Sequence, residues 1–287
     1  GINYFDGYLS HMAFVDGANV AHTTFGETDS TSGIWKFKSP SGITWGTNGF
    51  HLKFENSANL GVDSSSNTSN WTVNGNLKQA LDTPSNVHAT FNTLFVQQAP
   101  STTNFGNTRL DQSSSAWKSR LTTLGVSSGK WYAEFKAGTI SSGSPYKYNQ
   151  FGVVNDDLTT GSTGNFGYVG DNDYGWGLNW NGTVNHSDAN QGGSFSSFAT
   201  GDIICVAMDL DNHKVYWRKN DSAWMNSGDP TSGSTGTGAI SLDSGKTYFF
   251  AASVYANECF ANFGNGFFGT TAITSAGSNG NGSLFEY

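Results

Sequence analysis

The feature that most constrains this chain is the alternation of apolar and polar side chains over short segments bounded by Gly, Asn, Asp or Ser. In residues 130–136, Trp131, Ala133 and Phe135 share one face. Side chains with a period of two lie on alternate faces of a β-strand, whereas a helix needs a period of 3.6 residues. Residues 203–210 and 214–219 flank a short polar break, which predicts a hairpin. We therefore expect an all-β chain of antiparallel strands.

Two further segments indicate how these strands pack. Residues 174–180 place aromatic and apolar side chains on one face, and Gly175 and Gly177 on the other, which leaves room for a close neighbour. Residues 248–255 are apolar on both faces, which predicts a central strand covered from both sides. Short strands separated by turn residues are typical of an antiparallel β-sandwich. The aromatic share of 14% argues against intrinsic disorder.

The texture of the sequence changes along the chain. Residues 1–95 contain Trp35, Trp45 and Trp71 among many turn residues, whereas regular strands begin at Gly129. We therefore expect a smaller β-rich segment over residues 1–95 and a β-sandwich domain over residues 96–287. Within the second domain, residues 96–128 fit a connection or an edge strand. Residues 228–238 and 275–283 are expected to be loops rich in Gly and Ser.

Charge and hydropathy exclude some classes of partner. The formal net charge is −8 and no basic patch is present, which argues against nucleic-acid binding. No stretch approaches the ~18 consecutive apolar residues of a membrane-spanning helix, so no membrane insertion is expected. Residues 1–6 lack the basic and apolar regions of a signal peptide, so none is expected. Cys205 and Cys259 lie in apolar stretches, which predicts two buried free thiols.

Catalytic motifs are not apparent. The sequence has no Gly-x-Ser-x-Gly elbow and no His-Glu-x-x-His, and its six histidines are scattered. Residues 264–269 match Gly-x-Gly-x-x-Gly, but the β-branched residues that follow do not predict the helix that a dinucleotide site needs. No acidic residue stands in the context of a glycosidase pair. We therefore expect no enzyme activity, no catalytic residues, no metal site and no cofactor.

Three acidic clusters leave two interpretations open. They lie at residues 156–157, 171–173 and 209–212. Carboxylate oxygens are the ligands that Ca²⁺ prefers, but none of the clusters has EF-hand spacing. Asp and Asn also form turns, because their side chains accept hydrogen bonds from nearby backbone. The sequence favours turns and leaves a bound Ca²⁺ as the alternative.

Aromatic residues are the remaining candidates for ligand binding. Trp176 and Trp180 could offer flat faces to sugar rings, although their alternation with Gly favours the inner face of a sandwich. Tyr146, Tyr148 and Trp224 lie in expected loops, where binding residues concentrate on a rigid scaffold. These five residues are our candidate binding site.

The second half of the chain resembles a SPRY domain. The matching segments occur in the same order over about 140 residues, and they are residues 129–135, 151–154, 174–176, 201–204, 209–220 and 261–264. The resemblance implies a bent, concanavalin-like β-sandwich (a jelly roll) that serves as a binding module rather than an enzyme.

The first half resembles a different kind of module. Residues 5–17 are similar to the closing strands of a laminin-G or concanavalin-like sandwich. The segments that follow resemble structural proteins of tailed bacteriophages, and they are residues 25–29, 33–36, 46–50, 70–74 and 82–86. This resemblance implies a virion protein that assembles with other virion proteins, and homotrimers are common among the fibres that it resembles.

Together, these resemblances imply a tail fibre or surface appendage that contacts a host receptor, either a surface glycan or a protein. The alternative is a capsid decoration or head-fibre protein with an architectural role. A secreted carbohydrate-active protein is a third interpretation.

Overall fold

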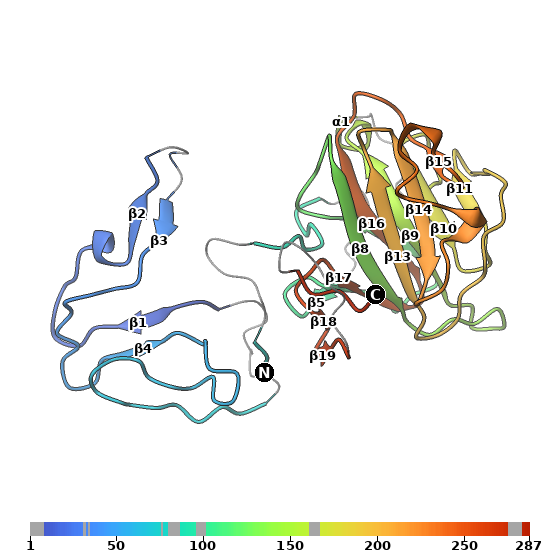
Figure 1. Ribbon diagram of the computed structural model, residues 1–287. Helices are drawn as coiled ribbons and strands as arrows, with labels where there is room; N and C mark the ends of the chain where they lie inside the picture. Colours follow the sequence, from blue (N-terminus) through green and yellow to red (C-terminus); the bar gives the residue numbers. More distant parts are fainter. Residues whose placement is uncertain are drawn as a thin grey trace. The chain divides into compact units, whose positions relative to one another are not determined.

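The computed structural model describes residues 9–30, 33, 35–75, 77–79, 87–95, 102–160, 167–274 and 283–287. The chain forms two compact units, shown in Figure 1. The smaller unit spans Tyr8–His88, and the larger one includes Ala89–Tyr287. The division falls after His88, whereas the composition of the sequence suggested residue 95.

The first sheet of the larger unit has six antiparallel strands in the order β12-β11-β10-β9-β16-β7. Its strands are β7 (Trp117–Leu121), β9 (Tyr148–Asn155), β10 (Gly175–Asn179), β11 (Val184–His186), β12 (Ala189–Asn190) and β16 (Tyr248–Tyr255). A short helix, α1 (Asp157–Thr160), follows β9.

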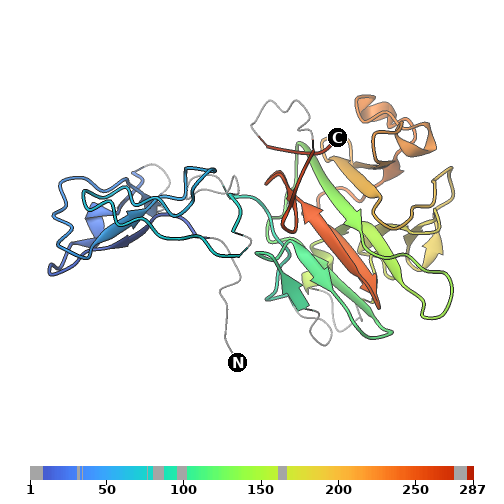
Figure 2. The same ribbon diagram turned by 90° about the horizontal axis from the view of Figure 1, so that it is seen from below.

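The second sheet has seven antiparallel strands in the order β15-β14-β13-β8-β17-β6-β5. Its strands are β5 (Thr102–Asn104), β6 (Arg109–Asp111), β8 (Lys130–Ala137), β13 (Ile203–Asp209), β14 (Lys214–Lys219), β15 (Ile240–Ser241) and β17 (Glu258–Asn262). Figure 1 and Figure 2 show the two sheets as stacked layers. Except for the five-residue β7, the outermost strands of both sheets have only two or three residues each.

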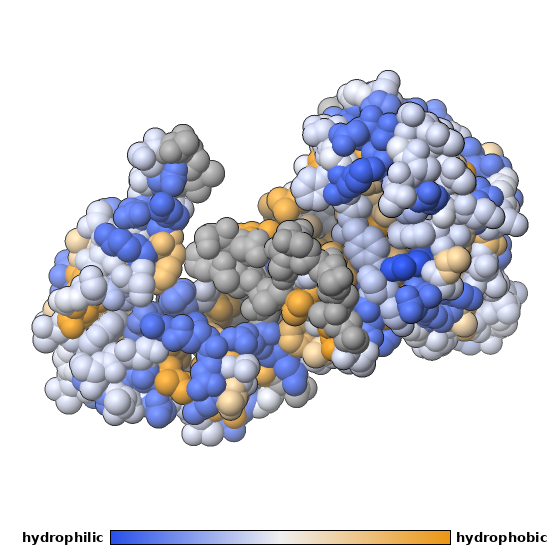
Figure 3. All heavy atoms as spheres, in the orientation of Figure 1, coloured by the Kyte–Doolittle hydropathy of each residue, from blue (hydrophilic) through white to orange (hydrophobic). Residues whose placement is uncertain are grey.

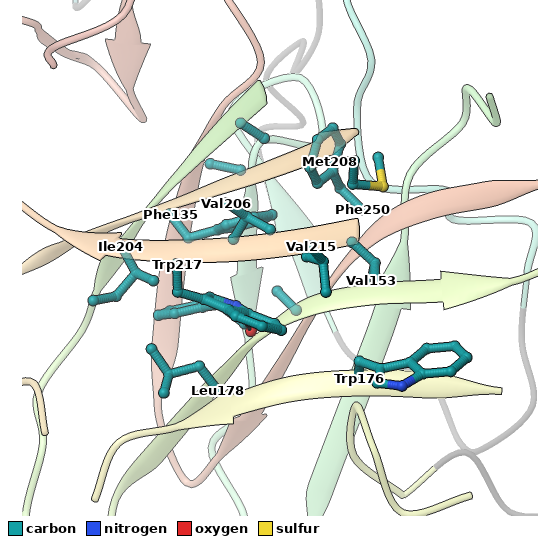
Figure 4. Close-up of a cluster of buried hydrophobic side chains, with 14 of the residues drawn as sticks. Phe135, Val153, Trp176, Leu178, Ile204, Val206, Met208, Val215, Trp217 and Phe250 are labelled. Carbon is teal, nitrogen blue, oxygen red and sulfur yellow. Dashed lines mark hydrogen bonds between the residues drawn. The ribbon is translucent and has the colours of Figure 1, made fainter. Parts of the chain in front are cut away.

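The core of the larger unit lies between these sheets. In Figure 4, Val206 and Trp217 of one sheet point toward Val153 and Leu178 of the other. The indole Nε1 of Trp217 donates a hydrogen bond to the carbonyl oxygen of Phe151, 3.0 Å away, and so links the two layers. The larger unit is therefore an antiparallel β-sandwich, as the sequence predicts.

Individual strand predictions are confirmed. β8 matches the expected strand, with Ala133 and Phe135 buried in the core. β13 and β14 form the expected hairpin, and His213 takes the left-handed conformation of its turn at φ 55°. β16 pairs on both sides, with β9 and with β7, and most of its side chains are buried. Cys205 and Cys259 are free and buried.

The glycine face of β10 has the close neighbour that the sequence predicts. A Cβ atom at Gly177 would lie 2.3 Å from the carbonyl oxygen of Val169, and one at Gly175 would lie 2.8 Å from the nitrogen of Gly170. The loop that contains Val169 therefore lies directly on this face of the sheet. Side chains at these two positions would displace it.

The remaining segments contain only short elements. β18 (Phe267–Phe268), inside the Gly264-x-Gly-x-x-Gly269 motif, pairs with β19 (Thr271–Ala272), just after it, in a small hairpin. The described residues that follow the motif, up to Thr274, therefore form no helix. The loop at residues 228–238 contains a 3-10 turn, η3 (Gly233–Thr235), and η2 (Met225–Ser227) precedes it. Of the segment expected to be a connection or edge strand, residues 102–121 supply β5, β6 and β7. Residues 96–101 and most of the loop predicted at residues 275–283 lie outside the described residues.

The described residues of the smaller unit form two two-stranded sheets and no sandwich. β1 (Met12–Phe14) pairs with β4 (Phe50–Leu52), and β2 (Gly26–Thr28) pairs with β3 (Trp35–Phe37). A 3-10 turn, η1 (His22–Thr24), precedes β2. Of the segment expected to form closing strands at residues 5–17, Met12–Phe14 is a strand and residues 5–8 lie outside the described residues.

A buried carboxylate organises the turns of the smaller unit. Asp63 accepts hydrogen bonds from the backbone nitrogens of His51, Ser65 and Ser69 at 2.7–2.8 Å, and from the Ser65 hydroxyl at 2.8 Å. Burial alone would raise the pKa of Asp63, but these donors outweigh burial and hold the pKa below its ordinary value. Asp63 therefore fixes the loop after β4 as an anion.

The surface is mixed in polarity. On the face drawn in Figure 3, hydrophilic and intermediate residues cover most of the area, and hydrophobic residues gather in several small areas. None of the helices in the part of the chain that the structure describes is long and apolar enough to cross a membrane.

Candidate functional site

Three aromatic residues form a row across three neighbouring strands of the six-stranded sheet. Tyr255, at the end of β16, is paired with Trp117 of β7 on one side and with Tyr148 of β9 on the other. Directly paired residues on neighbouring antiparallel strands place their side chains on the same face of a sheet. Their ring centroids are 5.6 Å apart for Trp117 and Tyr255, and 5.7 Å apart for Tyr148 and Tyr255.

Three more rings extend this row. Trp180, just after β10, stacks on Tyr148 with centroids 5.2 Å apart and planes 3° apart. Tyr146 lies 5.9 Å from Tyr148, and Tyr168 lies 5.3 Å from Trp117. We call the six residues the aromatic patch, and they are Trp117, Tyr146, Tyr148, Tyr168, Trp180 and Tyr255.

The strand period explains why Trp117, Tyr148 and Tyr255 face away from the core, whereas Trp180 lies at the end of β10 and also packs against the edge of the core. In β9, Phe151 and Val153 belong to the core between the sheets, so Tyr148 lies on the opposite face. The next pair along the sheet on that outer face consists of Ser119 and Ser253, whose hydroxyl oxygens are 2.7 Å apart. The backbone nitrogen of Val169 donates to Ser253 at 2.8 Å, which ties the loop carrying Tyr168 to the sheet.

Two carboxylates lie at the Tyr168 end of the patch. Asp171 accepts hydrogen bonds from the backbone nitrogens of Gly167 at 2.6 Å and Tyr168 at 3.2 Å. The Tyr168 hydroxyl donates to Asp188. Burial, helped by the negative charge of Asp188, raises the pKa of Asp171 to about 6, although the two backbone donors act in the opposite direction. These carboxylates hold Tyr168 in place and give this end of the patch a negative charge.

The patch combines apolar ring surface with free polar atoms. Tyr146 is 50% exposed and the other five residues are partly exposed. Among the described residues, none is hydrogen-bonded to the hydroxyls of Tyr146, Tyr148 and Tyr255 or to the indole nitrogens of Trp117 and Trp180. Such rings suit ligands that have apolar and hydroxyl-bearing faces together, because the ring excludes water and its polar atom remains able to hydrogen-bond.

The structure brings together three of the five binding candidates suggested by the sequence: Tyr146, Tyr148 and Trp180. Trp176 is 3% exposed and packs in the core, stacked on His186 at 4.2 Å, so it offers no surface to a ligand. Trp224 lies beyond β14 of the other sheet, where the Arg218 guanidinium sits 5.0 Å from its ring.

Sequence reasoning missed the other members of the patch. The sequence predicts a connection or edge strand around Trp117, and a strand covered from both sides that ends at Tyr255. The position of Tyr255 at the end of its strand could have predicted its exposure, because the layers that cover a central strand often do not reach its last residue. Tyr168 carries no such signal, because its place depends on the fold of its loop.

Turn hydrogen bonds and ion pairs occupy the acidic clusters. Asp209 pairs with Lys130 and accepts from the backbone nitrogen of Asn212 at 3.2 Å. Asp157 pairs with Lys246 at 2.6 Å. Within the described ranges, no group of three or more His, Cys, Asp or Glu is placed to hold a metal ion.

Comparisons with known proteins give a distant structural likeness. No known protein family matches the sequence, and no curated protein matches it. Among solved structures, the chain is similar to the SPRY domain of human HERC1, with 16% sequence identity and a TM-score of 0.41. That likeness covers 54% of this chain and 87% of the other.

Proposed function

We propose that this chain is a non-enzymatic recognition protein whose aromatic patch binds carbohydrate. The observation that carries the proposal is the patch itself, in which three rings on the outer face of a rigid sheet meet three rings from the adjoining loops. Five of their polar atoms have no hydrogen-bond partner in the described chain. A pyranose ring has the matching chemistry, because its C–H face is apolar and its rim carries hydroxyls.

The negative charge around the patch disfavours acidic glycans as ligands. Asp171 and Asp188 lie beside Tyr168 at one end, and the chain has a net charge of −8. Like charges brought together at an interface oppose binding. The patch therefore favours neutral glycans over sialylated or uronic-acid glycans.

The biological setting that we propose is the surface of a phage particle. Its support is the resemblance of the sequence to structural proteins of tailed bacteriophages. In this setting the protein is part of a tail fibre or surface appendage, assembles with other virion proteins and contacts a host glycan. Labelled antibodies imaged on whole particles test this placement, and label on the head would instead indicate a capsid decoration protein.

A glycan array tests the binding proposal directly. We expect the wild-type chain to bind neutral glycans, and Tyr146→Ala and Trp180→Ala to weaken binding about tenfold, since losing an aromatic contact costs roughly 1 kcal/mol or more. Tyr146 is the safer variant, because its exposed ring contributes little to folding.

Trp131→Ala is the matched control. Trp131 is a 46% exposed tryptophan in β8 of the other sheet, so its loss should leave glycan binding unchanged. Absence of binding by the wild-type chain, or equal losses in Trp131→Ala and Trp180→Ala, would contradict the proposal.

A further inference from the structure

The smaller unit contains a pocket that the proposed glycan site does not use. Its volume is about 360 Å³, and its lining residues are Ser10, His11, Ala13, Phe25, Trp35, Phe37 and His51. Two imidazoles in a pocket walled by aromatic rings form a group whose chemistry differs from that of the aromatic patch.

The two imidazoles are placed as ligands of one metal ion would be. Nδ1 of His11 lies 3.4 Å from Nε2 of His51, and the ring centroids are 5.6 Å apart. Tetrahedral Zn²⁺ bound to imidazole at about 2.0–2.1 Å holds two such nitrogens about 3.3–3.4 Å apart. The same separation also fits a long N–H···N hydrogen bond between the two rings. The pair can therefore either share a hydrogen bond or, once both nitrogens are deprotonated, bind a shared metal ion.

The fold holds both rings in this arrangement. His11 stacks on Phe37 with centroids 3.8 Å apart, and His51 stacks on Trp45 at 5.6 Å. His51 lies in β4, and its backbone nitrogen is bound by Asp63. Fixed rings lose little freedom when they bind an ion, so the pair is preorganised.

The backbone of His11 is strained. Its φ of 51° lies in the left-handed region, which non-glycine residues rarely adopt. Such a conformation persists only where the surrounding structure maintains it. At His11, the stacking of the ring on Phe37 is part of that surrounding structure.

We propose that His11 and His51 bind one late first-row divalent transition metal ion of the Zn²⁺ type through these two nitrogens. Imidazole is a preferred ligand of this class of ion. Since the described residues offer no third His, Cys, Asp or Glu, the remaining coordination positions face the pocket and take water or a donor atom of a ligand. The carboxylates of Asp63 and Glu55 favour a cation electrostatically, whereas Lys53 opposes it.

Calorimetric titration of the untagged full chain with Zn²⁺ tests the site. We expect saturable binding of one ion, weakened at least about tenfold in His51→Ala and His11→Asn, as for loss of a metal-site interaction. Asn is chosen at position 11 because it tolerates the left-handed backbone, so the variant removes the ligand without straining the fold.

His22→Ala is the control, because His22 is an exposed histidine of the same unit that does not line the pocket. It should bind Zn²⁺ as the wild type does. No saturable binding by the wild type, or an equal loss in His22→Ala, would overturn the proposal.

Nitrogen NMR of the imidazoles gives a readout independent of affinity. Addition of Zn²⁺ should shift Nδ1 of His11 and Nε2 of His51 together, in a one-to-one ratio with the chain. Unchanged shifts at saturating Zn²⁺ would mean that the pair is only hydrogen-bonded, and would reject the site. Neither result depends on whether the aromatic patch binds glycan.

Discussion

At the scale of single residues, Asp171 connects the loop that precedes β10 to the aromatic patch through its hydrogen bond with Tyr168. Its carboxylate accepts hydrogen bonds from the backbone nitrogens of Gly167 and Tyr168, yet its buried Oδ1 has no partner among the described residues. Burial with an unsatisfied oxygen destabilises the charged form of a carboxylate relative to its state in water, which raises its pKa. Asp171 therefore orients Tyr168 at some cost to stability near neutral pH.

This cost predicts a pH dependence of folding. The pKa of Asp171 is about 6 in the folded chain, whereas an aspartate in an unfolded chain titrates near its ordinary value. Between about pH 4 and pH 6 the folded chain keeps a proton that the unfolded chain has lost, so this residue makes the free energy of unfolding fall as pH rises.

Asp171→Asn should remove this decrease of the free energy of unfolding with rising pH. Asn still accepts from the two backbone nitrogens, so we expect the variant to match the wild type near pH 4 and to exceed it by about 1–2 kcal/mol at pH 7. Urea unfolding followed by tryptophan fluorescence at several pH values measures the difference. Parallel curves for the two proteins across this range would contradict the assignment.

At the scale of elements, the close approach of the Val169 loop to β10 decides where Tyr168 lies. The approach needs a residue without a side chain at Gly177, where a Cβ atom would lie 2.3 Å from a backbone oxygen. Backbone cannot move aside as easily as a flexible side chain can. The strand, the loop and one end of the aromatic patch are therefore coupled.

Gly177→Ala should break this coupling. We expect a loss of about 1–3 kcal/mol in the free energy of unfolding, typical of overpacking, together with weaker glycan binding as Tyr168 is displaced. Gly143→Ala is the matched control, because a Cβ atom there meets nothing within 4 Å. Equal free energies of unfolding for the two variants would show that the loop containing Val169 can move away from β10 without loss of stability, and would contradict the prediction.

The strands themselves could be predicted from the sequence, but the aromatic patch could not. Period-two alternation predicts β8, β13 and β14 from local sequence, and the glycines of β10 predict a close neighbour on one face of that strand. Whether Trp117 meets Tyr148 depends on both pairing with β16, and that register is set by strands far apart in the chain. Alternation likewise assigns Trp176 and Trp180 to one face, without revealing that only Trp176 is buried.

At the scale of the whole molecule, the two units rely on different means of stabilisation. The larger one has an extensive core between two sheets. In the described part of the smaller one, Leu52 and Leu60 are the buried aliphatic residues, and hydrogen bonds to Asp63 hold its turns. Composition alone could not place the boundary, because residues 89–95 resemble the smaller unit in texture but contribute Phe91 to the larger core.

This difference predicts that Asp63→Ala acts on one unit only. Losing several hydrogen bonds to a buried charge should cost about 2–4 kcal/mol there. Hydrogen exchange should show lost protection at the amides of His51, Ser65 and Ser69, with β16 unchanged. The partly exposed Asp16, whose Oδ2 accepts a hydrogen bond from the backbone nitrogen of Asn48 at 3.0 Å, provides the control Asp16→Ala. Exchange that accelerates equally throughout both units would refute the prediction.

The short outermost strands of the larger unit limit edge-to-edge association between neighbouring molecules. A sheet recruits a neighbouring molecule through a run of unpaired backbone groups, and strands of two or three residues offer too short a run. β7, the longer exception, carries Lys118 and Arg120. We therefore expect the larger unit to remain free of fibrils at high local concentration, because its edge strands are too short to pair into a continuous β-sheet.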